Sequence, residues 1–219
     1  MKKKFLNKNY TCVAVSKTKS EKNIKELYDF GYRHFGENKV QELVIKTKNL
    51  PKDIHWHMIG HLQTNKVKMI VPFVYLIHSV DSLKVLSKIN KESEKIGKIT
   101  NCLIQINISN EESKYGFSIN EIEKIILNNN LNNFNSIVIK GLMGMASFSD
   151  DKLLIKNEFK NLKNLYELIK TNFESNNNNN NNIDFDTLSM GMSNDYAIAL
   201  NEGSNMVRIG SLLFGKRNY

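Results

Sequence analysis

The chain has 219 residues, enough to bury a sizeable core, and its net charge is +9, from 31 lysine and arginine residues against 22 acidic ones. Only three of the basic residues are arginines, and the lysines are spread over predicted helix faces, which favours a solvated basic surface over a nucleic-acid-binding stripe. No apolar run approaches the ~20 residues of a membrane span, so the sequence argues against a membrane protein.

The chain starts with the basic segment MKKKFLNKNY, which lacks the apolar core of a signal peptide. Cys12 and Cys102 lie far apart, each within an apolar strand candidate. Two buried free thiols are therefore expected, in place of a disulfide framework, which indicates a reducing compartment. We accordingly expect a cytoplasmic protein.

Short apolar runs alternate along the chain with longer amphipathic stretches. The predicted strands are Thr11–Ser16, His34–Glu37, His55–Gly60, Tyr75–Val80, Asn101–Asn107, Val138–Met143, Thr187–Met190 and Met206–Ile209. Helical stretches include Ser20–Phe30, Ser82–Ile96, Asn120–Leu127 and Asp151–Phe173. Eight strand–helix units predict an α/β fold, a single (β/α)8 TIM barrel over residues 1–219. An open doubly wound sheet is the alternative, but no GxGxxG follows the first strand.

The segment from Ser175 to Asn182, SNNNNNNN, is of low complexity. Such a tract cannot build a packed core, so we expect a loop insertion between a helix and the next strand. The helix-to-strand side of a barrel lies away from the face where barrel enzymes place their sites.

Polar and glycine residues follow most of the predicted strands, at the carboxyl ends where barrel sites lie. The eighth unit, MVRIGSLLFG, gives the sharpest signal, because Gly210 and Ser211 precede a short helical turn whose first amides can bind an anion. Ser189 and the amides near Gly191 would join the same pocket. The alternative is a C-terminal cap on an ordinary barrel.

Arg208 lies within the eighth strand, in a chain that otherwise uses lysine for positive charge. A strand arginine indicates a need for a rigid planar cation. It could pair with a buried carboxylate. It could equally face a ligand ring nitrogen, which a permanent positive charge would keep unprotonated.

Lys17 follows the first strand, and an amine projecting into the barrel mouth would suit a Schiff base with an aldehyde cofactor. A lysine at a strand end is more often a surface residue, and the phosphate site predicted across the mouth is what favours the reactive interpretation. Lys19 lies two positions further along and is the weaker candidate.

The histidines of HWH place His55 and His57 on one face of the third strand, with His61 in the loop that follows. An HxH pair can begin a metal site, but carboxylates at other strand ends are sparse. We therefore predict no metal. His57 and His78 are expected to hydrogen-bond in the barrel interior or to line a cofactor pocket.

Several segments occur in a fixed order: AVSKTK, FGENKVQE, WHMIGHLQTNK, HSVDS, LIQINIS, SKYGF, GLMGMA and LSMGMSNDYAIALNEGSNMVRIGSLLFGKR. From about Thr11 to Arg217 the chain resembles the pyridoxal phosphate homeostasis protein family, also called the proline synthase co-transcribed homologues. The resemblance implies a single alanine-racemase-like (β/α)8 barrel. Family members usually carry a helix before the first strand, so the resemblance also implies a shortened N-terminal segment here.

The resemblance further implies that Lys17, the lysine of VSK, forms a Schiff base (an internal aldimine) with pyridoxal 5'-phosphate (PLP). Asn38 of GEN would lie beside the ring, and Arg208 would face the pyridine nitrogen. The remaining cofactor contacts implied are Ser189, Gly210 and Ser211 at the phosphate, with His78 and Met190 in the pocket.

The function implied is a PLP-binding protein of intracellular PLP homeostasis, holding the cofactor for buffering or for delivery to PLP-dependent apoenzymes. We expect a monomer without catalytic turnover and without nucleic-acid or membrane partners. Racemases of similar fold need a second acid/base group and a further C-terminal domain, for which we expect no room after the eighth unit. A PLP-dependent racemase-like enzyme is the alternative, and a cofactor-free aldolase that uses Lys17 on a phosphosugar is a third hypothesis.

Overall fold

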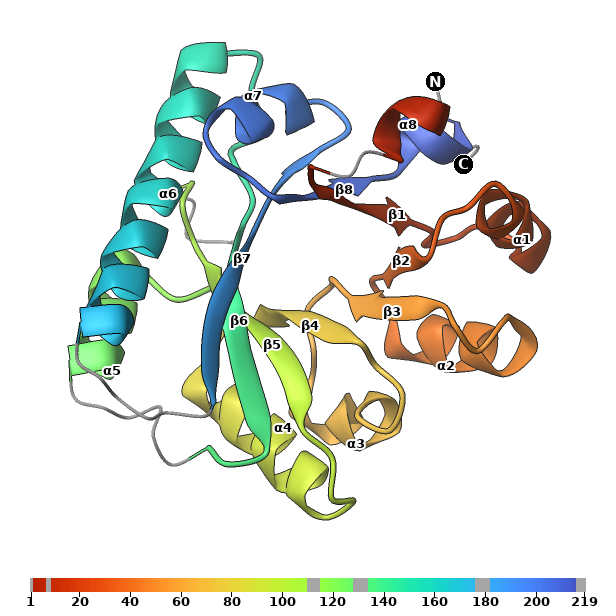
Figure 1. The fold of residues 1–219 in the computed structure, drawn as a ribbon, viewed down its shortest axis with the longest axis horizontal. Helices are drawn as coiled ribbons and strands as arrows, with labels where there is room; N and C mark the ends of the chain where they lie inside the picture. The colour runs from red at the N-terminus through yellow and green to blue at the C-terminus, as the bar shows by residue number, and fades with distance from the viewer. Residues whose placement is uncertain (1, 7–8, 110–114, 128–133, 176–181, 216–219) are drawn as a thin grey trace.

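The computed structural model describes residues 2–6, 9–109, 115–127, 134–175 and 182–215. Eight parallel strands pair in chain order, and the last pairs with the first, so the sheet closes into a barrel (Figure 1). The strands are β1 (Thr11–Val15), β2 (His34–Glu37), β3 (His55–Met58), β4 (Leu76–Val80), β5 (Thr100–Ile106), β6 (Ile137–Gly144), β7 (Ile183–Met192) and β8 (Met206–Ile209). The predicted (β/α)8 barrel is confirmed.

Helices surround the barrel on the outside (Figure 1). They are α1 (Glu21–Asp29), α2 (Val40–Asn49), α3 (Val67–Ile70), α4 (Leu83–Glu94), α5 (Ile119–Leu127), α6 (Lys152–Ser175), α7 (Tyr196–Asn201) and α8 (Ser211–Phe214), with 3-10 turns at Lys2–Phe5 and Thr64–Lys66. Serines fix several helix starts by accepting a hydrogen bond from a first-turn amide. Ser20 accepts from Asn23 at 3.3 Å, and Ser118 and Glu121 cap each other reciprocally before α5.

The strands bury side chains on both faces. A small inner cluster fills the barrel, with one residue from each of five strands: Val13, Leu76, Leu103, Met143 and Met206. The outer face packs against the helices in the main core, where Phe159 of α6 is fully buried. Burying such a side chain contributes roughly 1.5–3 kcal/mol, so the two apolar layers hold the barrel closed. Burial on both faces is also why the strands appear as nearly continuous apolar runs.

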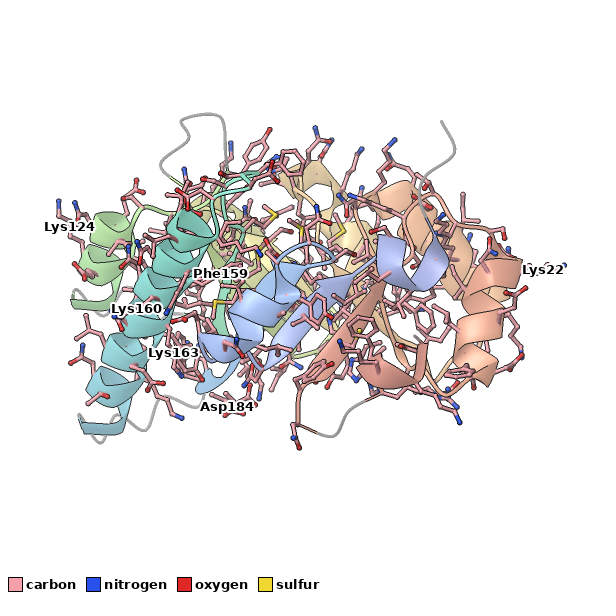
Figure 2. The ribbon with its side chains drawn as sticks, turned by 90° about the horizontal axis from the view of Figure 1, so that it is seen from above. Lys22, Lys124, Phe159, Lys160, Lys163 and Asp184 are labelled. Atoms are coloured by element: carbon pink, nitrogen blue, oxygen red, sulfur yellow. The ribbon has the colours of Figure 1, made fainter. Side chains whose placement is uncertain are left out.

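Lysines lie on the solvent side of the helices. Figure 2 shows Lys22 of α1, Lys124 of α5 and Lys160 of α6 pointing away from the barrel, and all three are exposed. Lys163 pairs with Glu167 on the same helix at 2.5 Å. The positive charge is thus distributed over several helices, as the sequence predicts.

Strand β7 begins at Ile183, four residues before the predicted Thr187. The added segment alternates, with Phe185 buried and Asp184 and Asp186 exposed, and both aspartates pair with Lys140 of β6. The asparagine tract falls between the end of α6 and the start of β7, and its residues 176–181 lie outside the described residues.

Gly141 lets β6 and β7 approach closely at an irregularity in their pairing. Its φ is +142°, and a Cβ there would lie 1.8 Å from the carbonyl oxygen of Thr187, so only glycine fits. Cys12 and Cys102 are both free and buried, as predicted. No helix in the described part of the chain has the length and apolar character to cross a membrane.

Candidate functional site

Lys17 follows β1 at the carboxyl end of the barrel. The strand ends at Val15, and Lys17 and Thr18 form a turn in which Thr18 has a positive φ of 65°. Odd-numbered positions of β1 share the inner face, because Val13 belongs to the inner cluster. Lys17 is half-buried in this turn, two residues beyond the strand end, so its backbone lies at the rim of the mouth.

Gly210 joins β8 to the short helix α8. Its amide donates to the Ser193 hydroxyl at 3.1 Å, which brings the loop after β7 to the start of α8. The first amides of a helix have no carbonyl partner within it, and with the hydroxyls of Ser193 and Ser211 they offer donors to an anion. Asp195 lies in the same loop as Ser193 and is buried. Burial raises the pKa of its carboxyl group, while the hydrogen bond from the Met192 amide and the positive charge of Arg208 oppose this shift. The predicted anion site is therefore rich in donors and has one carboxyl close by.

Lys17 and the start of α8 lie on neighbouring strands. The barrel closes between β1 and β8, with Ala14 opposite Ile209. A Cβ at Gly210 would lie 3.5 Å from the Cβ of Val15. The prediction that the amine and the anion site face each other across the mouth is wrong, because it treated the first and last strands as opposite when closure makes them adjacent. An amine and a phosphate of one small molecule are more easily served by adjacent strands.

Arg208 is buried inside the barrel below this region. Its guanidinium donates to the carbonyl and hydroxyl oxygens of Ser189, at 2.9 and 2.7 Å, and to the Gly144 carbonyl at 2.9 Å. Burial lowers the pKa of Arg208 to about 10, and the charge of Asp195 opposes the shift. The cation is thus held rigidly by neutral oxygens and stays charged at neutral pH.

A row of hydrogen-bonded histidines crosses the barrel interior to Ser189. The Nδ1–Nε2 distances are 3.4 Å from His55 to His34, 2.9 Å from His34 to His57 and 2.8 Å from His57 to His78. His78 Nδ1 then lies 3.1 Å from the Ser189 hydroxyl. We call these four residues the histidine column, and it ends on the group that Arg208 also binds.

Three members of the column are held neutral. Burial lowers the pKa of His34 to about 4, with a smaller contribution from His55. Burial likewise lowers the pKa of His57 and of His78 well below the usual range, and the charge of Arg208 adds to the effect on His78. Arg208 is therefore the cation at the inner end of the column at neutral pH.

Neutral imidazoles each have one donor and one acceptor, which restricts the proton arrangement of the column. Arg208 only donates, so the Ser189 oxygen accepts from it. If the serine hydroxyl also donates to His78 Nδ1, the three neutral histidines His34, His57 and His78 carry their protons on Nε2. If His78 donates to the serine, these three carry their protons on Nδ1 and the hydroxyl proton is available to another acceptor. The tautomers of these three histidines therefore change together.

Asn38 and Met190 complete the predicted set. Asn38 follows β2 at the mouth and is half-buried, and a Cβ at Gly60 would lie 2.4 Å from its carbonyl oxygen, so the loops after β2 and β3 are in close contact. Met190 is fully buried in the main core, next to Ser189 in sequence and on the opposite face of β7. The structure groups His78, Ser189 and Arg208 directly, sets Lys17, Gly210 and Ser211 above them, and leaves Met190 in the outer layer.

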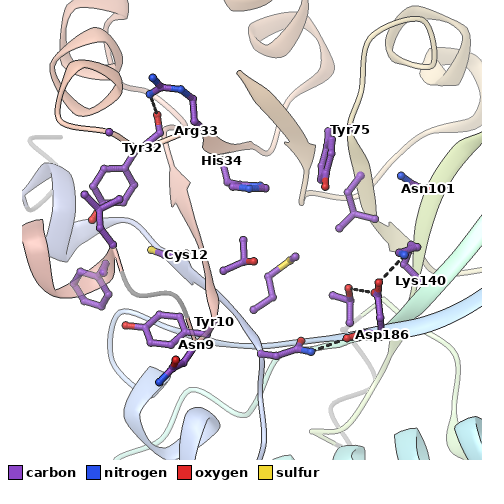
Figure 3. Close-up of a pocket in the computed structure, with 18 residues that line it drawn as sticks. Asn9, Tyr10, Cys12, Tyr32, Arg33, His34, Tyr75, Asn101, Lys140 and Asp186 are labelled. Carbon is purple, nitrogen blue, oxygen red and sulfur yellow. Dashed lines mark hydrogen bonds and ion pairs between the residues drawn. The ribbon is translucent and has the colours of Figure 1, made fainter. Parts of the chain in front are cut away.

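A cavity of about 680 Å³ lies at the other end of the barrel, where the strands begin (Figure 3). Tyr10, His34 and Tyr75 are among its lining residues, and Lys140 in its wall is paired with Asp184 and Asp186. None of the predicted site residues lines it. Of the histidine column, only His34 is among the residues that line this cavity.

The metal interpretation of HxH finds no support in the described residues, where no group of three or more histidine, cysteine or acidic side chains is placed to hold an ion. His61 instead bonds Asp81 at 2.8 Å and stacks on Tyr115, with ring centroids 4.0 Å apart. His57 and His78 hydrogen-bond in the interior, as predicted.

Sequence reasoning missed two features of this region. Ser193 lies just after β7, in the segment GMSND, but only the structure shows that its hydroxyl accepts a hydrogen bond from the Gly210 amide. Lys46 of α2 reaches the backbone of Ser16 beside Lys17, and its place in an amphipathic helix gave no signal of burial.

This closed barrel of eight parallel strands belongs to the class of alanine-racemase-type barrels. The family model described as alanine racemase, N-terminal domain, matches residues 1–218. Alanine racemase of Clostridium difficile shares the fold with a TM-score of 0.77 at 17% identity, covering all of this chain and 55% of that one.

More similar relatives narrow the class. The chain is 38% identical over 212 residues to a pyridoxal phosphate homeostasis protein of Pasteurella multocida (94% of this chain, 86% of the relative), and 41% identical to one of Pongo abelii (94% and 76%). PipY of Synechococcus elongatus, solved with PLP bound, superposes with a TM-score of 0.84 at 28% identity, covering 97% and 96% of the two chains. The chain belongs to the pyridoxal phosphate homeostasis protein family.

Proposed function

We propose that this protein binds PLP on the amine of Lys17 and holds it for buffering or delivery in PLP homeostasis. The observation that supports the proposal is the pairing of β1 with β8, since the turn of Lys17 and Gly210 thereby follow adjacent strands, and β8 carries the buried Arg208. A primary amine, phosphate donors and a fixed cation are the three groups that the aldehyde, phosphate and pyridine nitrogen of PLP require. The relatives' names and the PLP-bound PipY support this assignment.

When bound, PLP supplies an aldehyde that reacts reversibly with a primary amine. Lys17 would provide that amine from the inner rim. The amides that begin α8, with Ser211 and Ser193, would hold the phosphate. Arg208 cannot accept a proton, so it would favour an unprotonated pyridine nitrogen, and the neutral His57 and His78 behind Ser189 add no competing charge.

We propose that the recipients of the cofactor are PLP-dependent apoenzymes and that the protein acts as a cytoplasmic monomer without nucleic-acid partners. The two buried free thiols support the reducing compartment. The lysines spread over the helices support a solvated surface. Size-exclusion chromatography with light scattering tests the monomer, which a stable dimer would overturn.

The binding proposal is tested by titrating PLP into the wild type, Lys17→Ala and Lys19→Ala. Lys19 is the matched control, because it lies two residues away and its amine donates to the Phe214 carbonyl at 3.4 Å. We expect the visible absorption band of amine-linked PLP in the wild type and in Lys19→Ala, and its loss in Lys17→Ala. A band that persists in Lys17→Ala and is lost in Lys19→Ala contradicts the assignment.

Turnover is tested on the same samples. Incubation of PLP-loaded protein with L-alanine should leave its optical rotation unchanged over many hours. Sustained inversion that depends on Lys17 would instead establish a racemase.

A further inference from the structure

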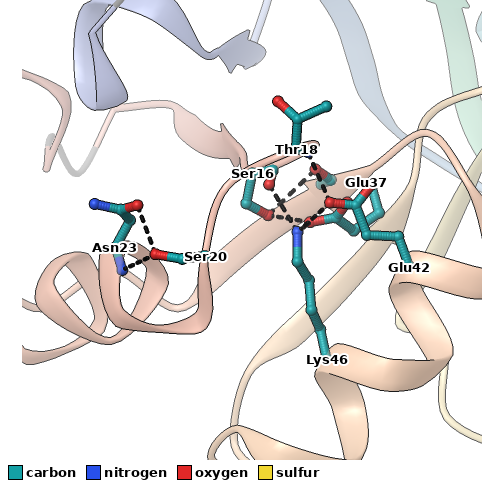
Figure 4. A network of polar contacts seen from close by, with 8 residues as sticks. Ser16, Thr18, Ser20, Asn23, Glu37, Glu42 and Lys46 are labelled. Atoms are coloured by element: carbon teal, nitrogen blue, oxygen red, sulfur yellow. Dashed lines mark hydrogen bonds and ion pairs between the residues drawn. The ribbon is translucent and has the colours of Figure 1, made fainter. Parts of the chain in front are cut away.

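The two residues on either side of Lys17 are held by side chains from helix α2 (Figure 4). Lys46 Nζ donates to the Ser16 carbonyl oxygen at 2.8 Å. The Thr18 amide donates to Glu42 Oε1 at 2.7 Å. The turn that carries Lys17 is therefore fixed from both ends by one helix.

A second acid, Glu37, joins these groups. Glu37, the last residue of β2, accepts from the Ser16 hydroxyl at 2.5 Å and pairs with Lys46 at 2.7 Å. Lys46 also pairs with Glu42 at 2.6 Å, so one ammonium connects the carboxyl groups of Glu37 and Glu42. We call Glu37, Glu42 and Lys46 the α2 clamp.

The clamp is unusually buried for charged residues. Glu37 is fully buried, and 4% of Lys46 is exposed. Among the described buried side-chain atoms, Glu37 Oε2 is one of two without a hydrogen-bond partner, the other being the Ser79 hydroxyl. Buried ion pairs contribute little net stability because desolvation offsets their attraction, so the clamp is better explained by the geometry it imposes than by the stability it adds.

The geometry imposed is a strained one. Thr18 has a φ of 65°, in the left-handed region that residues with a Cβ rarely adopt. Such a conformation persists where its surroundings hold it in place. The hydrogen bond from the Thr18 amide to Glu42 does so directly, at the residue after Lys17.

We propose that Glu37, Glu42 and Lys46 are positioning residues that hold the turn of Lys17 so that its amine meets the cofactor aldehyde above Arg208. The inference rests on the proposed function of Lys17. A flexible lysine reaches one point most effectively when its own backbone is fixed, and misplacing a reacting group by about 1 Å costs on the order of 100-fold in reaction rate. Glu42 is the member to test, because its side chain is 23% exposed and its removal leaves the buried Glu37–Lys46 pair in place.

The experiment compares Glu42→Ala, Glu42→Gln and Glu92→Ala. Glutamine keeps an oxygen that can accept from the Thr18 amide, so it should restore the positioning. Glu92 of α4 is the matched control, since it accepts from Lys88 at 2.6 Å and from Lys95 at 2.9 Å, away from the mouth. Two quantities are measured on each: amide hydrogen exchange of Thr18 in the PLP-free protein, and PLP affinity from the absorption band.

We expect Glu42→Ala to speed Thr18 exchange at least tenfold and to weaken PLP binding about tenfold. Glu42→Gln should stay within threefold of the wild type in both, and Glu92→Ala should leave both unchanged. Faster exchange with wild-type affinity in Glu42→Ala overturns the inference, as does an equal loss of affinity in Glu92→Ala. Failure of the proposed function is distinct, because the wild type itself would then lack a band that depends on Lys17.

Discussion

The histidine column should make the folded protein sensitive to acid, and His34 is the member whose contribution can be isolated. Burial lowers the pKa of His34 from 6.5 to about 4. Between pH 4 and pH 6.5 the imidazole of His34 is protonated in the unfolded chain and neutral in the folded protein. Its contribution to the free energy of unfolding is therefore complete above pH 6.5 and is lost as the pH falls towards 4. From pH 7.5 to pH 5 the loss is about 2 kcal/mol.

Glu37 has the opposite effect over the same range. Burial raises its pKa from 4.5 to about 7, against the opposing charge of Lys46, so the folded protein holds a proton that the unfolded chain releases. Its contribution to the free energy of unfolding is complete below pH 4.5 and is lost as the pH rises through 7, which is opposite in sign to the contribution of His34. The pH profile of the wild type sums these contributions with those of His57 and His78, so it isolates none of them.

The variant His34→Gln removes the titration of His34 and leaves that of Glu37. Urea unfolding at pH 7.5 and pH 5 gives the free energy of unfolding of both proteins. The free energy of unfolding of the wild type minus that of His34→Gln should be about 2 kcal/mol smaller at pH 5 than at pH 7.5. Parallel pH dependence in the wild type and His34→Gln would refute a lowered pKa of His34.

Three further variants test the site and the barrel. Gly210→Ala has room for its methyl group and should fold normally, but it should bind PLP about tenfold more weakly while binding pyridoxal, which lacks the phosphate, unchanged; equal losses would contradict the phosphate site. Arg208→Lys should lower the free energy of unfolding in urea by ~2 kcal/mol, because a single ammonium cannot replace the hydrogen bonds of the guanidinium to Ser189 and Gly144. Unchanged stability would show that these hydrogen bonds add little. Gly141→Ala should lower the free energy of unfolding by at least ~3 kcal/mol, because the added methyl group clashes with Thr187. Gly97→Ala is the control: its φ is also positive but the space around it is open, so it should cost ~1 kcal/mol. Similar costs for the two variants would refute the close approach of β6 and β7.

The barrel could be predicted from sequence because its strands are buried on both faces and its helices on one. That difference gives short apolar runs beside longer amphipathic stretches, and eight repeats of the pair define the closure. The register within the barrel is harder to predict. Lys17 and Gly210 were correctly placed at strand ends, but their adjacency follows from closure between β1 and β8.

The α2 clamp shows why part of the site could not be predicted. Lys46 shares α2 with the exposed Lys48, and nothing in the local sequence pattern separates the two. Its burial depends on Glu37, which arrives from β2, and on the backbone of Ser16, which arrives from β1. The histidine column is similar: HxH marks two of its members, but the contact from His57 to His78 joins different strands.

The central claim is that the amine of Lys17 carries the cofactor. It is tested most directly by reducing PLP-loaded protein with borohydride, digesting it, and finding the modified peptide by mass spectrometry. The account predicts the added mass of reduced PLP on Lys17, in the segment that follows β1. Modification of Lys19 or of scattered surface lysines, with Lys17 unmodified, would contradict it.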